Sequence, residues 1–280
     1  MTADSVAVIG GGQMGAGIAQ VFLTTGAAVT IVEPVDPDAA RTRVAGGLEG
    51  AAQRGKLAED VSTVLARLSV TGSTSRLPDD TALVVEAVPE DPRLKAQVLR
   101  DAEAAVGAGA VLATNTSSLS VAELAAVLDR PDRFLCLHFF NPVPASRLVE
   151  IVVPAATADD VVDTAQAWVS RIGRTGIVVR DSPGFASSRL GVLLGLEAIR
   201  MLEEEVADAE AIDTAMELGY RHPMGPLRST DLVGLDVRLA IAEYLHRTLG
   251  ERFAPPQLLR DKVAAGELGR KTGRGFYDYP

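Results

Sequence analysis

The two side chains best suited to proton transfer are His138 and Glu150. His138 ends an apolar run of strand length, 134–137, and Glu150 lies inside a second apolar run, 148–153. Asn and Pro residues between the two runs force a turn, so the pattern predicts a strand, a loop and a second strand. A carboxylate in such a run is costly to bury unless it is paired, and the imidazole brought back by the turn is a suitable partner.

Pairing with a carboxylate would hold the imidazole of His138 in one tautomer and raise its basicity, which makes it a candidate general base. A second interpretation fits the same residues: His138 is a hydrogen-bonded residue at a strand end, and Glu150 is an edge residue that faces water. The pair alone leaves both interpretations open.

A glycine-rich turn near the start of the chain indicates a dinucleotide site. It follows a buried-type strand, 5–10, and precedes a helical pattern, 16–25, as the G-x-G-x-x-G arrangement requires. The first glycine allows the tight turn, the second lets a pyrophosphate approach the backbone, and the third lets the helix pack close to the strand. We expect the cofactor to contact the residues of this turn: Gly10, Gly12, Gln13, Met14 and Gly15.

Glu33 follows the next predicted strand, 28–32, near the spacing at which an acidic residue accepts from a ribose 2′-hydroxyl. A 2′-phosphate would meet a like charge there, so the sequence favours NAD over NADP. A glycine-rich turn without a ligand is the structural alternative.

Polar residues follow three further predicted strands. Glu90 comes after 82–86, Ser117 comes after 111–113, and His138 ends the strand described above. In open α/β sheets, ligands bind along the edge where the strands have their carboxyl ends. The convergence of these side chains with the glycine turn predicts an enzyme.

The segment between the second and third strands, about 36–68, is longer than a simple crossover needs. It predicts two helices, one ending near Gln53 and one over 57–68, which together would form a flap. Arg54 and Lys56 help to make this region locally basic. They either clamp a phosphorylated ligand or belong to ordinary solvated helix faces.

Composition narrows the class of protein. The net charge of −10 over 280 residues argues against nucleic acid or an anionic membrane as a main partner. The single cysteine, Cys136, excludes internal disulfides and zinc-ligand spacing, so we expect no metal. We find neither a signal-peptide pattern nor an apolar stretch of membrane-spanning length, and we expect a cytoplasmic protein.

The elements predict an α/β fold: a Rossmann-type, mostly parallel sheet domain over 1–182, followed by an all-α dimerisation domain over 183–280. The boundary is a Ser-Pro-Gly break. The first helix beyond it, 189–205, is apolar on nearly all sides, which requires cover on more than one face and favours a homodimer. The remaining helices are expected at 208–218, 231–249 and 256–265.

These residues also carry a family pattern over essentially the whole chain. The sequence resembles the L-3-hydroxyacyl-CoA dehydrogenases, in particular the bacterial 3-hydroxybutyryl-CoA dehydrogenases. The markers, in order, are Ile9–Gly15, Val85–Glu90, Thr114–Ser118, His138–Pro142, Pro183–Phe185, Pro223–Pro226, Asp231–Asp236 and Lys271–Tyr277.

The resemblance implies an NAD-dependent oxidation of L-3-hydroxyacyl-CoA to 3-ketoacyl-CoA. His138 would be the general base, Glu150 would orient it, and Ser117 would hydrogen-bond the substrate's C3 oxygen. The other roles that the resemblance implies are nicotinamide-end contacts from Asn115 and Asn141, cofactor contacts from Glu90 and Lys95, and CoA phosphate contacts from Lys56 and Arg54.

One position departs from the family pattern. Ser188 stands where the family has an active-site asparagine, and a serine hydroxyl is shorter than an amide and has fewer donors and acceptors. Two other functions stay open at this point: a dehydrogenase of a free hydroxy acid on the same fold, and a dimeric NAD-binding protein without turnover.

Overall fold

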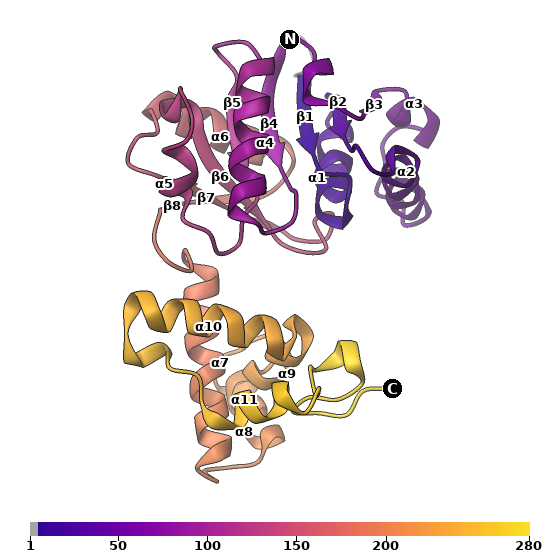
Figure 1. Ribbon diagram of the computed structural model, residues 1–280. Helices are drawn as coiled ribbons and strands as arrows, with labels where there is room; N and C mark the ends of the chain where they lie inside the picture. The colour runs from indigo at the N-terminus through magenta and orange to yellow at the C-terminus, as the bar shows by residue number, and fades with distance from the viewer. Residues whose placement is uncertain (1–4) are drawn as a thin grey trace. The chain divides into compact units, whose positions relative to one another are not determined.

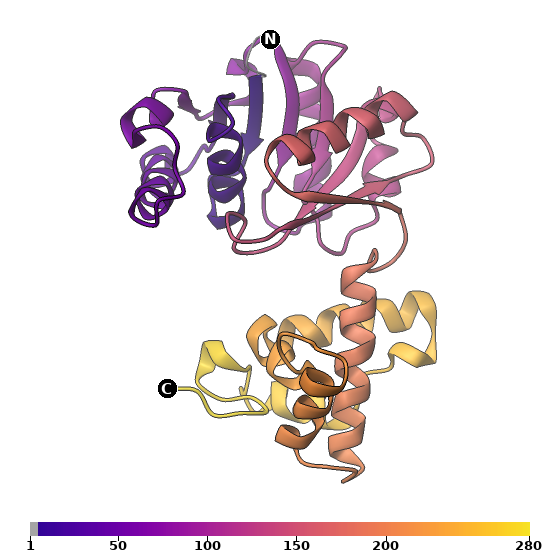
Figure 2. The ribbon, with the colours of Figure 1, turned by 180° about the vertical axis from the view of Figure 1, so that it is seen from behind.

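The computed structural model describes residues 5–280. These divide between Ser182 and Pro183 into two compact units, an α/β unit and a helical unit. Figures 1 and 2 show the chain from opposite sides.

The α/β unit is built on one eight-stranded sheet with the order β3-β2-β1-β4-β5-β6-β7-β8. Every neighbouring pair is parallel except β6 and β7, which are antiparallel. The predicted mostly parallel sheet is therefore confirmed. The strands are β1 (Ser5–Ile9), β2 (Ala28–Val32), β3 (Leu68–Thr71), β4 (Thr81–Glu86), β5 (Val111–Thr114), β6 (Phe134–Phe139), β7 (Leu148–Val153) and β8 (Thr175–Arg180).

Helices cover both faces of this sheet. Figures 1 and 2 show α4 and α5 on one face and α6 on the other. The helices of the unit are α1 (Gln13–Leu23), α2 (Pro37–Gln53), α3 (Val61–Leu65), α4 (Pro92–Ala105), α5 (Val121–Ala125) and α6 (Asp159–Arg171). Because both faces are covered, the central strands are predominantly apolar and almost fully buried.

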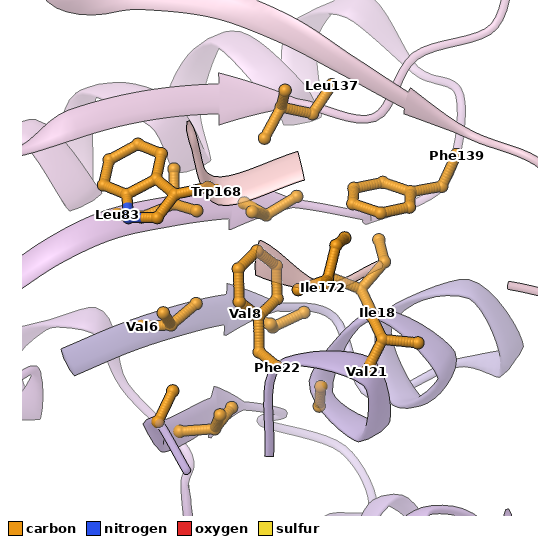
Figure 3. Packing of buried hydrophobic residues seen from close by; sticks show 14 of the residues in the cluster. Val6, Val8, Ile18, Val21, Phe22, Leu83, Leu137, Phe139, Trp168 and Ile172 are labelled. Atoms are coloured by element: carbon orange, nitrogen blue, oxygen red, sulfur yellow. The ribbon is translucent and has the colours of Figure 1, made fainter. Parts of the chain in front are cut away.

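The main core lies between the sheet, α1 and α6. Trp168 of α6 and Ile18 and Phe22 of α1 belong to one buried cluster with side chains of the strands, such as Val8 (Figure 3). This cluster holds α1 against the sheet, and α1 begins at the glycine turn, so the core also fixes the position of that turn.

Asp36 and Asp91 are the N-terminal caps of α2 and α4. The Asp36 carboxylate accepts a hydrogen bond from the Ala39 N–H, and the Asp91 carboxylate accepts from two N–H groups of the first turn of α4. In both cases proline follows at the first helical position, where its missing N–H carries no penalty.

The second helix of the expected flap is wrong in extent. Instead of 57–68, α3 covers only Val61–Leu65, because Leu68 pairs its backbone with Val29 in the sheet. The first helix, α2, packs on α1, and its buried residues include Val44 and Leu48. Gln20 of α1 donates a hydrogen bond to the Gly47 carbonyl and ties the two helices together.

The helical unit contains no strand longer than an isolated bridge among residues 183–280. Its helices are α7 (Ser187–Glu203), α8 (Ala209–Gly219), α9 (Pro226–Val233), α10 (Leu235–Leu249) and α11 (Gln257–Ala264). The expected continuous helix 231–249 is wrong: Gly234 has φ +102°, outside the helical region, and separates α9 from α10.

The end of the chain is tied to α9 through Asp231, which is buried. Its carboxylate accepts hydrogen bonds from the N–H groups of Phe276 and Tyr277 and from the Tyr279 hydroxyl. Gly275 is needed beside it, because a Cβ there would lie 2.1 Å from a carboxylate oxygen of Asp231. Within residues 5–280, no helix is both long and apolar enough to cross a membrane.

Candidate active site

His138 and Glu150 are brought together by the antiparallel pairing of β6 and β7, which places them directly opposite each other. The Nδ1 atom of His138 lies 2.7 Å from a carboxylate oxygen of Glu150. Glu150 has no exposed surface, and 8% of the His138 side chain is exposed. The predicted pairing is confirmed, and the alternative in which Glu150 faces water is wrong.

The position of Glu150 determines how His138 can act. A carboxylate at Nδ1 favours the tautomer with its proton on that nitrogen, so Nε2 carries the lone pair of the neutral ring. The ring of Phe140 packs beside the imidazole with the ring centroids 4.5 Å apart. The pair therefore presents an oriented imidazole that is hydrogen-bonded to a buried carboxylate.

His138 borders a cleft of about 340 Å3 at the carboxyl ends of the parallel strands. Most of the residues that sequence reasoning expected at this edge line it, among them Glu90, Asn115 and Ser117. The full lining is Met14, Ala87, Val88, Glu90, Lys95, Asn115, Ser117, His138, Phe139, Phe140 and Asn141.

A larger cleft of about 820 Å3 lies beside the glycine turn. The turn depends on its glycines, because a Cβ at Gly10 would lie 2.7 Å from the Ala87 carbonyl oxygen and a Cβ at Gly15 would lie 1.8 Å from the Gly10 carbonyl oxygen. A Cβ at Gly12 would meet no atom within 4 Å, so the backbone there is open to a ligand. The turn, followed by the N-terminus of α1, fits a pyrophosphate.

The two clefts adjoin. Met14, Ala87 and Val88 line both of them. A ligand that spans both clefts would therefore extend from the glycine turn to the edge where His138 lies.

Glu33 lines the larger cleft at the end of β2. Its carboxylate accepts hydrogen bonds of 2.9 Å from the N–H groups of Gly11 and Val35. Burial raises the pKa of Glu33, but these N–H groups and the Arg43 guanidinium outweigh burial and bring the pKa below its ordinary value. The residue is therefore a fixed negative charge that can still accept further hydrogen bonds.

A buried ion-pair network, which the sequence did not predict, lies behind the smaller cleft. The Lys95 ammonium, 1% exposed, lies 2.7 Å from a carboxylate oxygen of Glu86 and 3.3 Å from one of Glu90. It also donates to the Val88 carbonyl oxygen at 3.2 Å, so its three donors each have a protein partner. The Thr114 hydroxyl donates to the other oxygen of Glu86 at 2.6 Å.

Glu90 connects this network to the loop that carries Ser117. One of its oxygens accepts hydrogen bonds from the N–H groups of Ser117 and Ser118, at 3.0 and 3.2 Å, and from the Thr116 hydroxyl. Burial raises the pKa of Glu90, but Lys95 and these donors outweigh it and bring the pKa below its ordinary value. Glu90 therefore stays ionised and holds the loop after β5 in place.

Two asparagines complete the cleft edge. The Asn115 side-chain oxygen accepts from the Phe139 N–H at 2.9 Å and so links the ends of β5 and β6. The Asn141 side-chain oxygen accepts from the Gln13 side chain at 3.2 Å, which joins the loop after β6 to the first turn of α1.

Two predicted site residues of the α/β unit do not line either cleft. Arg54 and Lys56 are exposed at the end of α2, and among the described residues neither lines the two clefts. From that basic region it is Arg43 that reaches the glycine turn, donating to the Gly11 carbonyl oxygen at 3.1 Å. Ser188 is in the first turn of α7, in the helical unit.

Cys136 is fully buried in β6, and burial raises its pKa well above the ordinary value for a thiol. Both properties disfavour the thiolate, so Cys136 is suited to a structural rather than a nucleophilic role. Within residues 5–280, no group of three or more His, Cys, Asp or Glu side chains is arranged to hold a metal ion.

The fold and the glycine turn define a dinucleotide-binding protein. The α/β unit matches the NAD-binding domain of 3-hydroxyacyl-CoA dehydrogenase over residues 5–182, and the helical unit matches the C-terminal domain of the same enzymes over residues 184–279. The chain therefore belongs to the 3-hydroxyacyl-CoA dehydrogenase family, as the sequence markers indicated, and its cofactor is NAD.

Individual relatives align with this chain over nearly their full length. The chain is 40% identical to a probable 3-hydroxybutyryl-CoA dehydrogenase of Bacillus subtilis, with 100% of this chain and 98% of that one aligned. It is 41% identical to the 3-hydroxybutyryl-CoA dehydrogenase of Mycobacterium tuberculosis, with 98% of each covered. Its structure resembles that of the (S)-3-hydroxybutyryl-CoA dehydrogenase of Ralstonia eutropha with a TM-score of 0.95, 39% identity and complete coverage of both chains.

Proposed function

We propose that this chain catalyses the reversible, NAD-dependent oxidation of an L-3-hydroxyacyl-CoA to the 3-ketoacyl-CoA, with His138 as the general base. The observation that carries the proposal is the 2.7 Å contact between His138 and the buried Glu150 at a cleft that adjoins the glycine-turn cleft. A base in this position serves an oxidation in which a hydroxyl proton leaves together with a hydride.

His138 would take the proton of the 3-hydroxyl on Nε2, and Glu150 would stabilise the imidazolium that forms. Ser117, which lines the same cleft, would hydrogen-bond the C3 oxygen. NAD, when bound, supplies the acceptor for the hydride from C3.

The cofactor fits the residues of the larger cleft. The open backbone at Gly12 would receive the pyrophosphate, with Gln13, Met14 and the other glycines of the turn around it. Glu33 would accept from the adenosine ribose and repel a 2′-phosphate. Asn115 and Asn141 would border the nicotinamide end. Glu90 would position the loop that carries Ser117 by accepting its hydrogen bonds, with Lys95 as a buried counter-ion.

The CoA end of the substrate is assigned from its charge. Arg54 and Lys56 are exposed cations in an acidic protein, and they would contact the CoA phosphates. Ser188 would contact the substrate.

We also propose that the protein is a homodimer through its helical unit. Large apolar side chains are exposed on α7 and at the junction of α9 and α10, elements that pack against each other. They include Leu190, which is 68% exposed, and Leu232, Val233 and Val237. Such a surface is expected to be covered by a second copy.

The test is NADH oxidation at 340 nm with acetoacetyl-CoA, run beside NADPH and beside free acetoacetate. Turnover that requires both NADH and the thioester supports the proposal. Turnover of free acetoacetate at an equal kcat/KM would favour a free hydroxy acid as substrate. Tight NADH binding with no turnover of acyl-CoA of any length would favour a protein without turnover.

A further inference from the structure

Thr116 is a fully buried polar residue in the loop after β5, immediately before Ser117. Its hydroxyl donates a hydrogen bond to a carboxylate oxygen of Glu90. The same hydroxyl accepts hydrogen bonds from the N–H groups of Ser118 and Leu119, at 3.3 and 3.0 Å. A hydroxyl has one proton to donate and two lone pairs that can accept, so the Thr116 hydroxyl uses its whole hydrogen-bonding capacity inside this loop.

These bonds restrain the backbone of Ser117 on both sides. The Glu90 oxygen that binds the Thr116 hydroxyl, Oε1, also accepts from the Ser117 N–H at 3.0 Å. The next N–H along the chain, that of Ser118, is shared between this oxygen and the Thr116 hydroxyl. The backbone of Ser117 therefore has little freedom to move while the Thr116 hydroxyl is in place.

The same loop is bound to β6 on either side of His138. The Cys136 thiol donates to the Thr116 carbonyl oxygen at 3.6 Å, and the Phe139 N–H donates to the Asn115 side-chain oxygen at 2.9 Å. Both of these β6 residues lie within two positions of His138. The residues that precede the serine of the loop are therefore bound to the part of β6 that carries the imidazole.

The distance between Ser117 and His138 matters because the proposed reaction brings both side chains to one atom. His138 would take the proton from the C3 hydroxyl, and Ser117 would hydrogen-bond the same oxygen. A hydrogen bond weakens steeply when its distance or angle departs from the favoured range. Two groups that act on one oxygen must therefore be fixed relative to each other before the substrate binds.

We propose that Thr116 is a positioning residue for this reaction, whose buried hydroxyl fixes the loop after β5 so that Ser117 and His138 meet the same substrate oxygen. The inference rests on the proposed function, which assigns Ser117 to the C3 oxygen. Among the described residues Thr116 lines neither of the two clefts, so it acts through Ser117 and not on the substrate.

The experiment uses two substitutions that separate the hydroxyl of Thr116 from its shape. Thr116→Val replaces the hydroxyl by a methyl group of similar size, whereas Thr116→Ser keeps the hydroxyl and removes the methyl group. The matched control is Thr81→Val. Thr81 is also buried and its hydroxyl donates to the Pro78 carbonyl oxygen at 2.7 Å, but it lies at the start of β4, at the opposite end of that strand from the clefts.

Each variant is measured for kcat and KM with 3-hydroxybutyryl-CoA and NAD, for the dissociation constant of NADH, and for urea unfolding followed by the fluorescence of Trp168. Both threonine substitutions are also made in a Ser117→Ala background. This double-mutant cycle tests whether Thr116 acts through Ser117, because residues that act as one unit have non-additive effects.

Thr116→Val should lower kcat by about 10- to 100-fold, the scale of the loss when a reacting group is misplaced by about 1 Å. The dissociation constant of NADH should stay close to the wild-type value. Thr116→Ser should recover most of the loss, and Thr81→Val should keep the wild-type kcat. In the Ser117→Ala background Thr116→Val should have little further effect on kcat. If Thr116→Val does not fold, Thr116→Ala takes its place in the cycle.

Three results would overturn the inference while the proposed function stands. The first is a wild-type kcat in Thr116→Val. The second is an equal loss from Thr116→Val with and without the Ser117 hydroxyl, which would make the effect independent of Ser117. The third is a Thr116→Ser variant as impaired as Thr116→Val, which would assign the effect to the methyl group. If the wild type bound NADH but did not turn over acyl-CoA of any length, the proposed function would fail, and the positioning role would fail with it.

Discussion

Replacing Lys95 by methionine should destabilise the α/β unit far more than the loss of an exposed ion pair would. Lys95 is 1% exposed and lies 2.7 Å from Glu86, which is itself fully buried. Removing one partner of a buried pair leaves an uncompensated charge and typically costs about 3–5 kcal/mol. Glu86 keeps hydrogen bonds from the Thr114 hydroxyl and the Val88 N–H, so we expect a value near the lower end, about 3 kcal/mol.

The assay is urea unfolding followed by the fluorescence of Trp168. It is the single tryptophan of the chain and lies in α6, so it reports on the α/β unit. The matched control is Asp160→Asn, which breaks the ion pair with Arg133 in the same unit, where the Asp160 side chain is 69% exposed. The control should lose less than about 1 kcal/mol. If Lys95→Met were no more destabilising than this control, the buried network would not stabilise the unit as argued.

Three further predictions concern the glycine turn, the cofactor and the end of the chain. Glu33→Ser should raise kcat/KM with NADPH relative to NADH by roughly 10-fold or more, because it removes a like charge near the 2′-phosphate. Since the pKa of Glu33 is below its ordinary value, the wild-type preference for NADH should persist down to about pH 6. An unchanged NADPH-to-NADH ratio in the variant would count against the placement of Glu33 at the adenosine ribose. Gly15→Ala should abolish NADH binding in fluorescence titration, because its Cβ would lie 1.8 Å from the Gly10 carbonyl oxygen, whereas retained affinity would contradict the geometry. Asp231→Ala should lower the unfolding free energy of the helical unit by about 2–4 kcal/mol, because three donors, including the Tyr279 hydroxyl, lose their acceptor. Thermal unfolding followed by circular dichroism tests this prediction, and an unchanged melting temperature would refute it.

Local sequence signals predicted much of the α/β unit because their physical causes are local. Asp36 and Asp91 cap helices through N–H groups only two or three residues away, and proline follows each of them. The pairing of His138 with Glu150 could also be predicted, since two short apolar runs joined by one loop, 140–147, have few other ways to pair.

The predictions from sequence were wrong where tertiary contacts compete with a local helical pattern. Residues 57–68 have helical spacing, but Leu68 contributes its backbone to the edge of β2, and the helix is shortened to α3. Residues 231–249 also have helical spacing, yet Gly234 adopts a positive φ and the helix divides. Neither outcome is visible in the periodicity.

Buried charges were the least predictable feature, because burial depends on partners far away in the sequence. Glu86 ends an apolar strand just as Glu150 interrupts one, and that signal could have suggested a buried carboxylate in need of a cation. Its partner Lys95 has no feature in the sequence that separates it from an exposed helix residue. The same holds for Arg238, although it is buried in α10.

The most direct test of the central claim is the rate of hydride transfer in His138→Gln and Glu150→Gln, measured beside the dissociation constant for NADH. If His138 is the general base that Glu150 orients, kcat with 3-hydroxybutyryl-CoA should fall by about 100- to 10,000-fold in His138→Gln. It should fall substantially in Glu150→Gln as well, while NADH affinity stays close to the wild-type value in both. A kcat near the wild-type value in His138→Gln, with NADH bound normally, would show that the proton leaves by another route and would contradict the proposed mechanism.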